Sequence, residues 1–288
     1  MARETDDRSA ADSVDRLRPR GAVDDVASSA EQEGQLEPGS DGTVLKNLLE
    51  IKSVEEIDVR ETDALEQTTE SVVKNYDAAH RFVAADIRSI HRIWLQEIYA
   101  WAGEYRQVNV SKSGFPFASA ARIPPLMEAF ERGPLRQYTP CAPGPHATVA
   151  SALAEVHVEL VLIHPFREGN GRVARLLSTL MALQAGNPFL YFGMISDERK
   201  ADYFAAIQAG MDRNYQPMAG LFSEVIEISI GRARASGLAA RRDRAGTWQR
   251  NPRSCRFRSP SSSRRYQRAL REISSGLEGA RCFRRVAL

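Results

Sequence analysis

The stretch His164-Pro165-Phe166-Arg167-Glu168-Gly169-Asn170-Gly171-Arg172-Val173-Ala174-Arg175 decides the fold of this chain. Apolar residues recur near the helical period of 3.6 over residues 147–163 before the stretch and over residues 173–185 after it. We therefore expect a loop between two buried helices. Pro165 disfavours the helical conformation at the residue before it, and the two glycines permit backbone angles that side chains exclude.

The second half of this loop has the composition of a phosphate site. Successive amide groups in a Gly-Asn-Gly turn, followed at once by a helix N-terminus, form a concavity of positive partial charge. Gly169, Asn170 and Gly171 would line it. Arg172 and Arg175 are three residues apart on the first turn of the second helix, so we expect both guanidinium groups to reach the same anion.

The remaining polar residues of the loop suit a metal-assisted proton transfer. Glu168 would repel a bare anion, but it suits a Mg²⁺ ion that bridges phosphates. His164, with an ordinary pKa of about 6.5, can act as general base on an attacking hydroxyl. Phe166 is expected to point inward as an apolar anchor. Each residue type also occurs in purely structural roles, but together within twelve residues they serve one reaction.

The segment resembles the signature of the Fic family, His-Pro-Phe-x-(Asp/Glu)-Gly-Asn-Gly-Arg-x-x-Arg, and matches it at every specified position. The run Leu-Gln-Glu-Ile-Tyr-Ala-Trp-Ala-Gly-Glu-Tyr-Arg at residues 95–106 resembles the family as well. The resemblance implies an all-α, Fic-type helical bundle with one β-hairpin flap near the active site. It also implies transfer of AMP from ATP to a Ser, Thr or Tyr hydroxyl of a target protein, with release of pyrophosphate.

The resemblance assigns a role to each position of the motif. It implies that His164 is the base, that Phe166 is the core anchor and that Glu168 is the Mg²⁺ ligand. The phosphates would be held by Gly169, Asn170, Gly171 and Arg172, and the γ-phosphate by Arg175. Relatives with altered loops carry out phosphorylation or phosphocholine transfer, so another donor, including UMP transfer, is the alternative. The intact Gly-Asn-Gly-Arg favours AMP transfer.

Residues 105–117 predict a β-hairpin. Residues 105–110 alternate, with Val108 and Val110 on one face, and Lys112-Ser113-Gly114 has turn chemistry. In Fic relatives the matching hairpin lies over the active site and pairs with an extended stretch of the target by strand addition. Lys112 and Phe117 are the candidates for that role, and a hairpin that is only surface structure is the alternative.

Two short patterns suggest regulation. In Fic relatives the pattern (Ser/Thr)-x-x-x-Glu-(Gly/Asn) places a Glu against the second motif arginine and blocks productive ATP binding. It fits residues 29–34 and 274–279, so Glu33 and Glu278 are candidate inhibitors. A pattern this loose also arises by chance, which leaves inhibition by a separate partner such as an antitoxin, or no inhibition, as alternatives.

Composition divides the chain into three regions. Residues 1–42 are polar and predicted to be mostly disordered, with a short helix over 23–34. Residues 43–230 are expected to form the catalytic domain. Residues 231–288 contain 16 Arg, no Lys and three acids, a net charge of +13, while residues 1–230 hold 23 basic and 34 acidic residues, a net charge of −11. We expect this tail to be largely disordered.

The Arg-rich tail raises a different class of function. Its charge would attract nucleic acid or acidic surfaces, although a solvated extension has the same composition. A binding protein that acts through the tail, with a silent catalytic loop, is therefore a third hypothesis. No zinc-deaminase cysteine pair accompanies His157-Val158-Glu159, and no P-loop motif occurs.

Composition also bears on location. The chain has 288 residues with 43% hydrophobic content, and we expect no apolar run of membrane-spanning length. The first seven residues lack the apolar core of a secretory signal. The three Cys show neither paired nor metal-ligand spacing. A soluble protein of a reducing compartment, the cytoplasm, is expected, with a role as a toxin or as a delivered effector left open.

Overall fold

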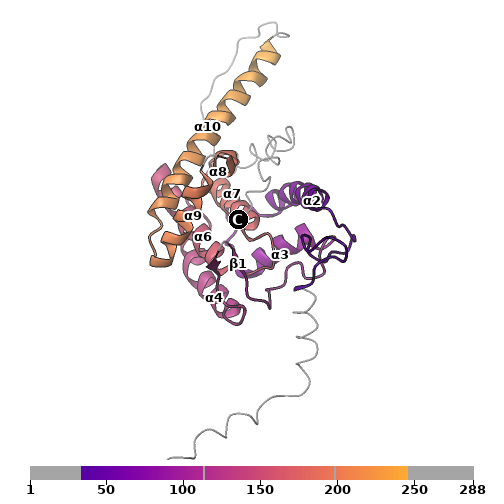
Figure 1. Cartoon of the computed structure of the whole chain (residues 1–288). Helices are drawn as coiled ribbons and strands as arrows, with labels where there is room; N and C mark the ends of the chain where they lie inside the picture. The colour runs from indigo at the N-terminus through magenta and orange to yellow at the C-terminus, as the bar shows by residue number, and fades with distance from the viewer. Residues whose placement is uncertain (1–33, 113, 198, 246–288) are drawn as a thin grey trace, which may run out of the picture.

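The computed structural model describes residues 34–112, 114–197 and 199–245 (Figure 1). Its helices are α2 (Val54–Asn75), α3 (Ala84–Leu95), α4 (Ile123–Phe130), α5 (Arg136–Tyr138), α6 (His146–Ile163), α7 (Asn170–Gln184), α8 (Gly193–Asp197), α9 (Lys200–Ala209) and α10 (Gln216–Ala245). Shorter helical turns are η1 (Ala120–Arg122), η2 (Glu131–Leu135) and η3 (Gly210–Asp212). Strands β1 (Ser111–Lys112) and β2 (Phe115–Pro116) form one antiparallel hairpin. The predicted all-α architecture with a single hairpin is confirmed.

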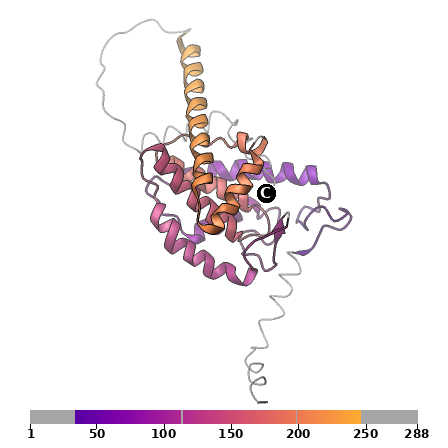
Figure 2. The same ribbon diagram turned by 60° about the vertical axis from the view of Figure 1, so that its left-hand side comes forward.

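Helix α6 is the centre of the bundle. It is apolar on nearly every face, so it can bury all of them, and α7 and α10 pack along its length (Figure 2). The prediction of a helix on either side of the motif is confirmed, since α6 ends at Ile163 and α7 begins at Asn170. The motif therefore joins two helices of the core.

Helix α6 also bears on the expected absence of a long apolar run. It has 18 residues and a mean hydropathy of 1.4, so by length and composition alone it meets the criteria for a membrane-spanning helix. However, 61% of its residues are buried inside the protein. The core helix of a folded bundle meets the same two criteria, and the packing of α6 explains its composition.

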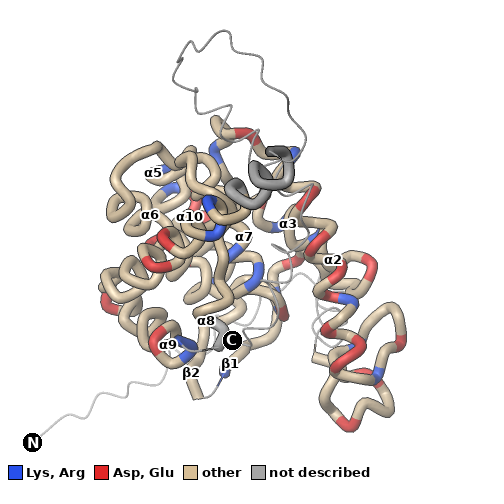
Figure 3. The backbone as a smooth tube through the Cα atoms, turned by 90° about the horizontal axis from the view of Figure 1, so that it is seen from above, with Lys and Arg blue, Asp and Glu red and all other residues tan. Residues whose placement is uncertain are grey.

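The folded body begins before residue 43, where the sequence suggests a boundary. Leu36 and Leu45 form an isolated antiparallel bridge, and the buried Glu37 side chain accepts a hydrogen bond from the Asn47 backbone amide at 3.1 Å. Helix α2 then runs for 22 residues, with exposed acids such as Glu55 and Glu56 along it (Figure 3). Residues 34–42 thus belong to the domain.

Two further boundaries differ from prediction. The strands lie at 111–112 and 115–116 rather than over 105–110, because residue 106 is drawn into the protein interior. Helix α10 continues to Ala245 and its end projects from the body, so the disorder predicted for residues 231–245 is wrong. This segment is rich in Ala and Arg, which favour helix without a core.

The candidates Glu33 and Glu278, and the helix predicted over 23–34 except its last residue, lie outside the described residues.

Candidate active site

The motif loop has a backbone that few residues can adopt. Helix α6 is capped by His164, which has φ 52° and ψ 58°, and α7 is preceded by Gly169 with φ 83°. A Cβ atom at Gly169 would lie 2.5 Å from Cζ3 of Trp94 on α3. Glycine is therefore required here both for the positive φ and for the contact with Trp94.

The Asn170 side chain closes this loop. Its Oδ1 accepts from the Phe166 amide and its Nδ2 donates to the Phe166 carbonyl, both at 2.8 Å. Phe166 is fully buried, which confirms the predicted anchor. The Asn170 side chain is thus engaged within the loop, so an anion would be bound by the backbone amides of the first turn of α7 rather than by this side chain.

The His91 side chain on α3 packs against the motif loop. Its ring stacks on Phe166 with centroids 3.9 Å apart, Nδ1 accepts from the Gly103 amide at 2.8 Å, and Nε2 donates to the Glu168 carbonyl at 3.1 Å. Burial lowers the pKa of His91 to about 4. A neutral ring with one donor and one acceptor is what these two partners require.

His164 is held in the state that a general base needs. Its Nδ1 lies 3.2 Å from the Val161 carbonyl and donates to it, which leaves the Nε2 lone pair to accept a proton. The ring is 7% exposed and stacks on Phe117 of the flap, with centroids 3.6 Å apart. Burial first, and Arg106 and Lys112 after it, lower the pKa to about 4, so the ring is neutral at neutral pH.

Glu168 presents an ionised carboxylate beside the N-terminus of α7. Its side chain is about half exposed, and Oε1 accepts from the Gly169 amide at 2.9 Å and lies 3.3 Å from Nη2 of Arg172. Desolvation opposes the charged form, but Arg172, the Gly169 amide and Lys112 outweigh it and lower the pKa of Glu168. Lys112 of β1 therefore acts electrostatically on both Glu168 and His164.

Arg172 is tied to α2 by a residue that the sequence analysis missed. Its Nη2 lies 2.6 Å from Oε2 of the buried Glu61, whose Oε1 accepts from the Tyr99 hydroxyl at 2.7 Å. The guanidinium also lies 4.6 Å from the Trp94 ring centroid. The sequence signal was an acid on the buried stripe of α2, one turn from Ile57 and from Leu65.

Replacing Glu61 with glutamine should destabilise the domain by about 3 kcal/mol, because Arg172 would stay largely buried with only half-exposed Glu168 as counter-charge. Urea denaturation at pH 7 measures this free energy of unfolding. Glu70→Gln is the matched control, since Glu70 pairs with Lys74 on the exposed face of α2 and should change stability by less than about 1 kcal/mol. Equal effects of the two variants would contradict a structural role for the Glu61 pair.

Arg175 belongs to a different set of partners on α6 and α9. It is fully buried, and its charge lies close enough to Tyr203 and His157 to favour a lower pKa in both. The Tyr203 hydroxyl lies 2.8 Å from Nε2 of His157, and His157 Nδ1 lies 3.2 Å from Ser178 Oγ. Ser178 already donates to the Ala174 carbonyl, so His157 donates from Nδ1 and accepts from Tyr203 at Nε2. The two motif arginines, expected to reach one anion together, thus have separate partners in this structure.

Replacing Tyr203 with phenylalanine should lower the free energy of unfolding by about 1–3 kcal/mol, because the buried His157 loses the hydroxyl that bonds its Nε2. Thermal or urea unfolding measures the change. Tyr138→Phe serves as the control, since Tyr138 bonds the Glu155 carboxylate at a half-buried position. An equal free energy of unfolding for Tyr203→Phe and the unaltered protein would refute a stabilising role for the hydrogen bonds of His157 with Tyr203 and Ser178.

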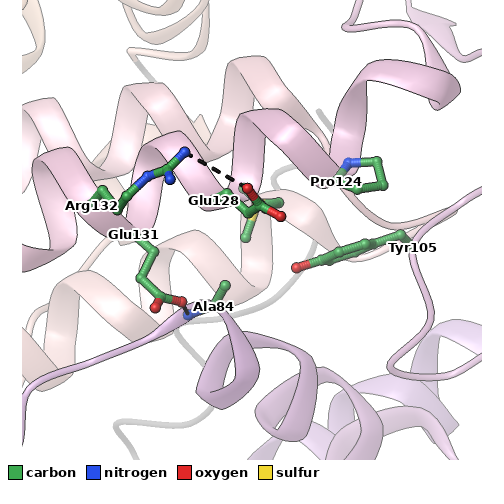
Figure 4. A pocket seen from close by; sticks show the side chains of 7 residues that line it. Ala84, Tyr105, Pro124, Glu128, Glu131 and Arg132 are labelled. Carbon is green, nitrogen blue, oxygen red and sulfur yellow. Dashed lines mark hydrogen bonds and ion pairs between the residues drawn. The ribbon is translucent and has the colours of Figure 1, made fainter.

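A separate cavity lies away from the motif, between the start of α3 and the α4–η2 segment (Figure 4). It has a volume of about 320 Å³, and the Tyr105 hydroxyl points into it. Glu131 accepts from the Ala84 amide at 2.8 Å, and Glu128 pairs with Arg132 at 3.7 Å. Its acidic groups are thus already engaged, and none of its lining residues belongs to the motif.

The structure brings the predicted residues of the motif and the flap into one region. His164 contacts Phe117, Glu168 contacts Arg172, and Lys112 is close enough to lower the pKa of both Glu168 and His164. Among the residues that the structure describes, no three His, Cys, Asp or Glu side chains form a metal-binding group. A metal here would depend on Glu168 together with the oxygens of a substrate.

Comparison with known proteins identifies this arrangement. The model of the Fic/DOC family matches residues 81–182, which include α3, the hairpin, α6, the motif and most of α7. Residues 81–182 of this chain form a Fic/DOC domain. The resemblance found in the motif is thereby confirmed, and the fold of the chain is the helical one expected from it.

Several relatives of this chain are named as protein adenylyltransferases. The probable protein adenylyltransferase Fic of Escherichia coli K12 is 28% identical over 140 residues, 49% of this chain and 68% of that protein. Protein adenylyltransferase Fic of Drosophila ananassae is 26% identical over 167 residues, which cover 58% of this chain but only 30% of the fly protein. The crystal structure of the Bartonella tribocorum effector BepC with bound AMPPNP has a TM-score of 0.56 and 25% identity, covering 67% of this chain and 96% of that one. These names support an enzyme of the nucleotidyltransferase type.

Proposed function

We propose that this protein transfers AMP from ATP to a hydroxyl side chain of a target protein and releases pyrophosphate. The observation that carries the proposal is the state of His164, which is neutral, with Nδ1 donating to Val161 and Nε2 available as acceptor. It stands at the end of α6, six residues before Asn170, where the anion-attracting N-terminus of α7 begins. Relatives named protein adenylyltransferase support the donor.

The residues divide the reaction between them. Nε2 of His164 takes the proton from the target hydroxyl, the hydroxyl oxygen bonds to the α-phosphorus, and the bond from that phosphorus to the pyrophosphate oxygen breaks. The backbone amides of Asn170 and Gly171 and the guanidinium of Arg172 stabilise the charge on the phosphates. Arg175 would reach the γ-phosphate, provided that its side chain turns from Tyr203.

Mg²⁺ fits the residues present. Mg²⁺ favours one or two carboxylates together with substrate phosphates and water, and Glu168 offers an ionised, half-exposed carboxylate beside the phosphate site. When bound, the ion would neutralise charge on the phosphates. The chain's own contribution is to keep Glu168 ionised through Arg172 and Lys112.

The hairpin flap supplies the surface for the target. Its strands are only two residues long and mostly exposed, so an extended segment of the target can add to the sheet at an open edge. Phe117 lies over the His164 ring, so a target segment paired with the flap would bring its hydroxyl toward Nε2. Lys112 and Phe117 remain the candidate target-binding residues.

The proposal is tested by labelling from ATP with a radioactive α-phosphate, in the presence of Mg²⁺ and a cell lysate. Labelled protein bands from the α-phosphate, with none from the γ-phosphate, would support AMP transfer, while γ-labelled bands alone would replace it with phosphorylation. Glu33→Gly and Glu278→Gly are assayed beside the unaltered protein. Stronger labelling in one of them would locate an inhibitory Glu, and equal labelling would favour a separate partner or no inhibition.

A further inference from the structure

Arg106 has an environment that the motif does not account for. Its side chain is fully buried, with no acidic side chain among the hydrogen-bond partners described for it. Instead the guanidinium donates to three backbone carbonyls. Nε donates to His164 at 2.7 Å, Nη1 donates to Val108 at 2.6 Å, and Nη2 donates to Ala118.

These three carbonyls belong to two parts of the site. His164 is the residue that carries the catalytic imidazole, while Val108 and Ala118 stand on the two legs of the flap, before β1 and after β2. The backbone amide of Arg106 adds a fourth bond, to the Pro165 carbonyl at 2.9 Å. One residue therefore connects the end of α6 with both ends of the hairpin.

The hydrogen bonds of Arg106 also fix the position of Phe117, the ring that covers the His164 imidazole. Ala118 directly follows Phe117, whose ring stacks on His164 at 3.6 Å and with an interplanar angle of 16°. The backbone at residue 118 is fixed by Arg106, and the neighbouring amide of Phe117 donates to the Val110 carbonyl at 3.2 Å. The aromatic ring is thus held in place from both sides of the hairpin.

We propose that Arg106 is a positioning residue that holds the flap and the His164 backbone as one unit, so that Phe117 shields the imidazole until a target segment displaces it. The inference rests on the proposed function for the meaning of His164 as a base. Lysine cannot replace this residue, because an ammonium group lacks the planar fork that reaches three carbonyls at once.

The test uses full-length protein with Arg106→Lys and Phe117→Ala, and Arg132→Lys as the matched control, since Arg132 is exposed on η2. The first readout is the rate at which diethyl pyrocarbonate modifies His164, followed by mass spectrometry of its peptide at pH 7. Both site variants should raise this rate about tenfold or more, the factor expected when a charge-assisted hydrogen bond or a covering ring is lost. Arg132→Lys should leave it unchanged.

The second readout separates positioning from nucleotide binding. Arg106→Lys should lower the turnover number for AMP transfer about tenfold, while the dissociation constant for ATP stays within about twofold, because the α7 N-terminus is held by Asn170 and Gly169 instead. A stable Arg106→Lys protein whose His164 is modified at the unaltered rate would overturn the inference. Equal losses in ATP affinity and turnover would do so as well.

A measurement on the unaltered protein covers the case in which Arg106→Lys does not fold. By NMR, the Arg106 Nε–H should exchange with solvent at least about a hundredfold more slowly than that of Arg132, since it donates to a buried carbonyl. Equal exchange rates would refute the proposed unit. The rates of His164 modification and of Arg106 Nε–H exchange can be measured without AMP transfer. They therefore test the role of Arg106 even if the labelling experiment detects no AMP transfer.

Discussion

Replacing His164 with alanine should reduce AMP transfer by about 10²–10⁴-fold, the usual contribution of a positioned general base. The hydroxyl of the target would have no group to take its proton, because Nδ1 is committed to Val161 and Nε2 is the only acceptor of the ring. ATP affinity should change little, since the phosphates are expected to bind the α7 N-terminus. Initial rates with α-labelled ATP, together with an equilibrium titration of ATP, measure both quantities.

His146→Ala is the matched control for this variant. His146 begins α6 at an exposed position, at the opposite end of the same helix from His164. It should retain full activity. An His164→Ala protein that labels targets at the unaltered rate would remove the general-base role, whereas loss of labelling in both variants would indicate damage to α6 rather than to the chemistry.

Acidification from pH 7 to pH 5 should lower the free energy of unfolding by about 6 kcal/mol, roughly 2 kcal/mol for each of His91, His157 and His164. Their pKa values in the folded protein are lowered from about 6.5 to about 4, about 3 and about 4. Between pH 6.5 and pH 4 these histidines are protonated in the unfolded chain but stay neutral in the folded protein. Stability is therefore fully present above pH 6.5 and falls as the pH decreases through this window.

Urea denaturation at pH 7 and at pH 5 measures the effect. His91→Gln is the control, because the amide offers one acceptor for Gly103 and one donor for Glu168 but does not titrate, and its pH-dependent loss should be smaller by about 2 kcal/mol. Glu168, with its lowered pKa, loses its stabilising charge only below the ordinary value of 4.5, outside this range. An equal free energy of unfolding at the two pH values would contradict the lowered histidine pKa values.

The parts of the site that the sequence predicts are those encoded within one short segment. The period of 3.6 on both sides of the motif predicts α6 and α7, and the apolar character of Phe166 predicts its burial. Neither inference needs a distant contact, because helix period and loop chemistry are local properties.

The parts that the sequence could not predict depend on long-range contacts. Glu61 and Arg172 are 111 positions apart along the chain, and no local pattern pairs them. The predicted strand over 105–110 was displaced because Arg106 bonds a carbonyl 58 residues away and keeps its own backbone out of the hairpin. Helix α10 extends past residue 230 in a segment rich in Ala and Arg, with Arg232 over the Tyr191 ring at 4.0 Å, whereas the prediction required a core pattern.

Trp94 has a practical consequence for measuring ligands. Its indole lies against Gly169 and beneath the Arg172 guanidinium, so it contacts both the backbone that would face a phosphate and a side chain that would bind one. A cation over an indole alters its fluorescence, and an anion that draws Arg172 from the ring would change the emission. We therefore expect Trp94 emission to change when an anion binds at the N-terminus of α7, so that binding can be followed in the unlabelled protein.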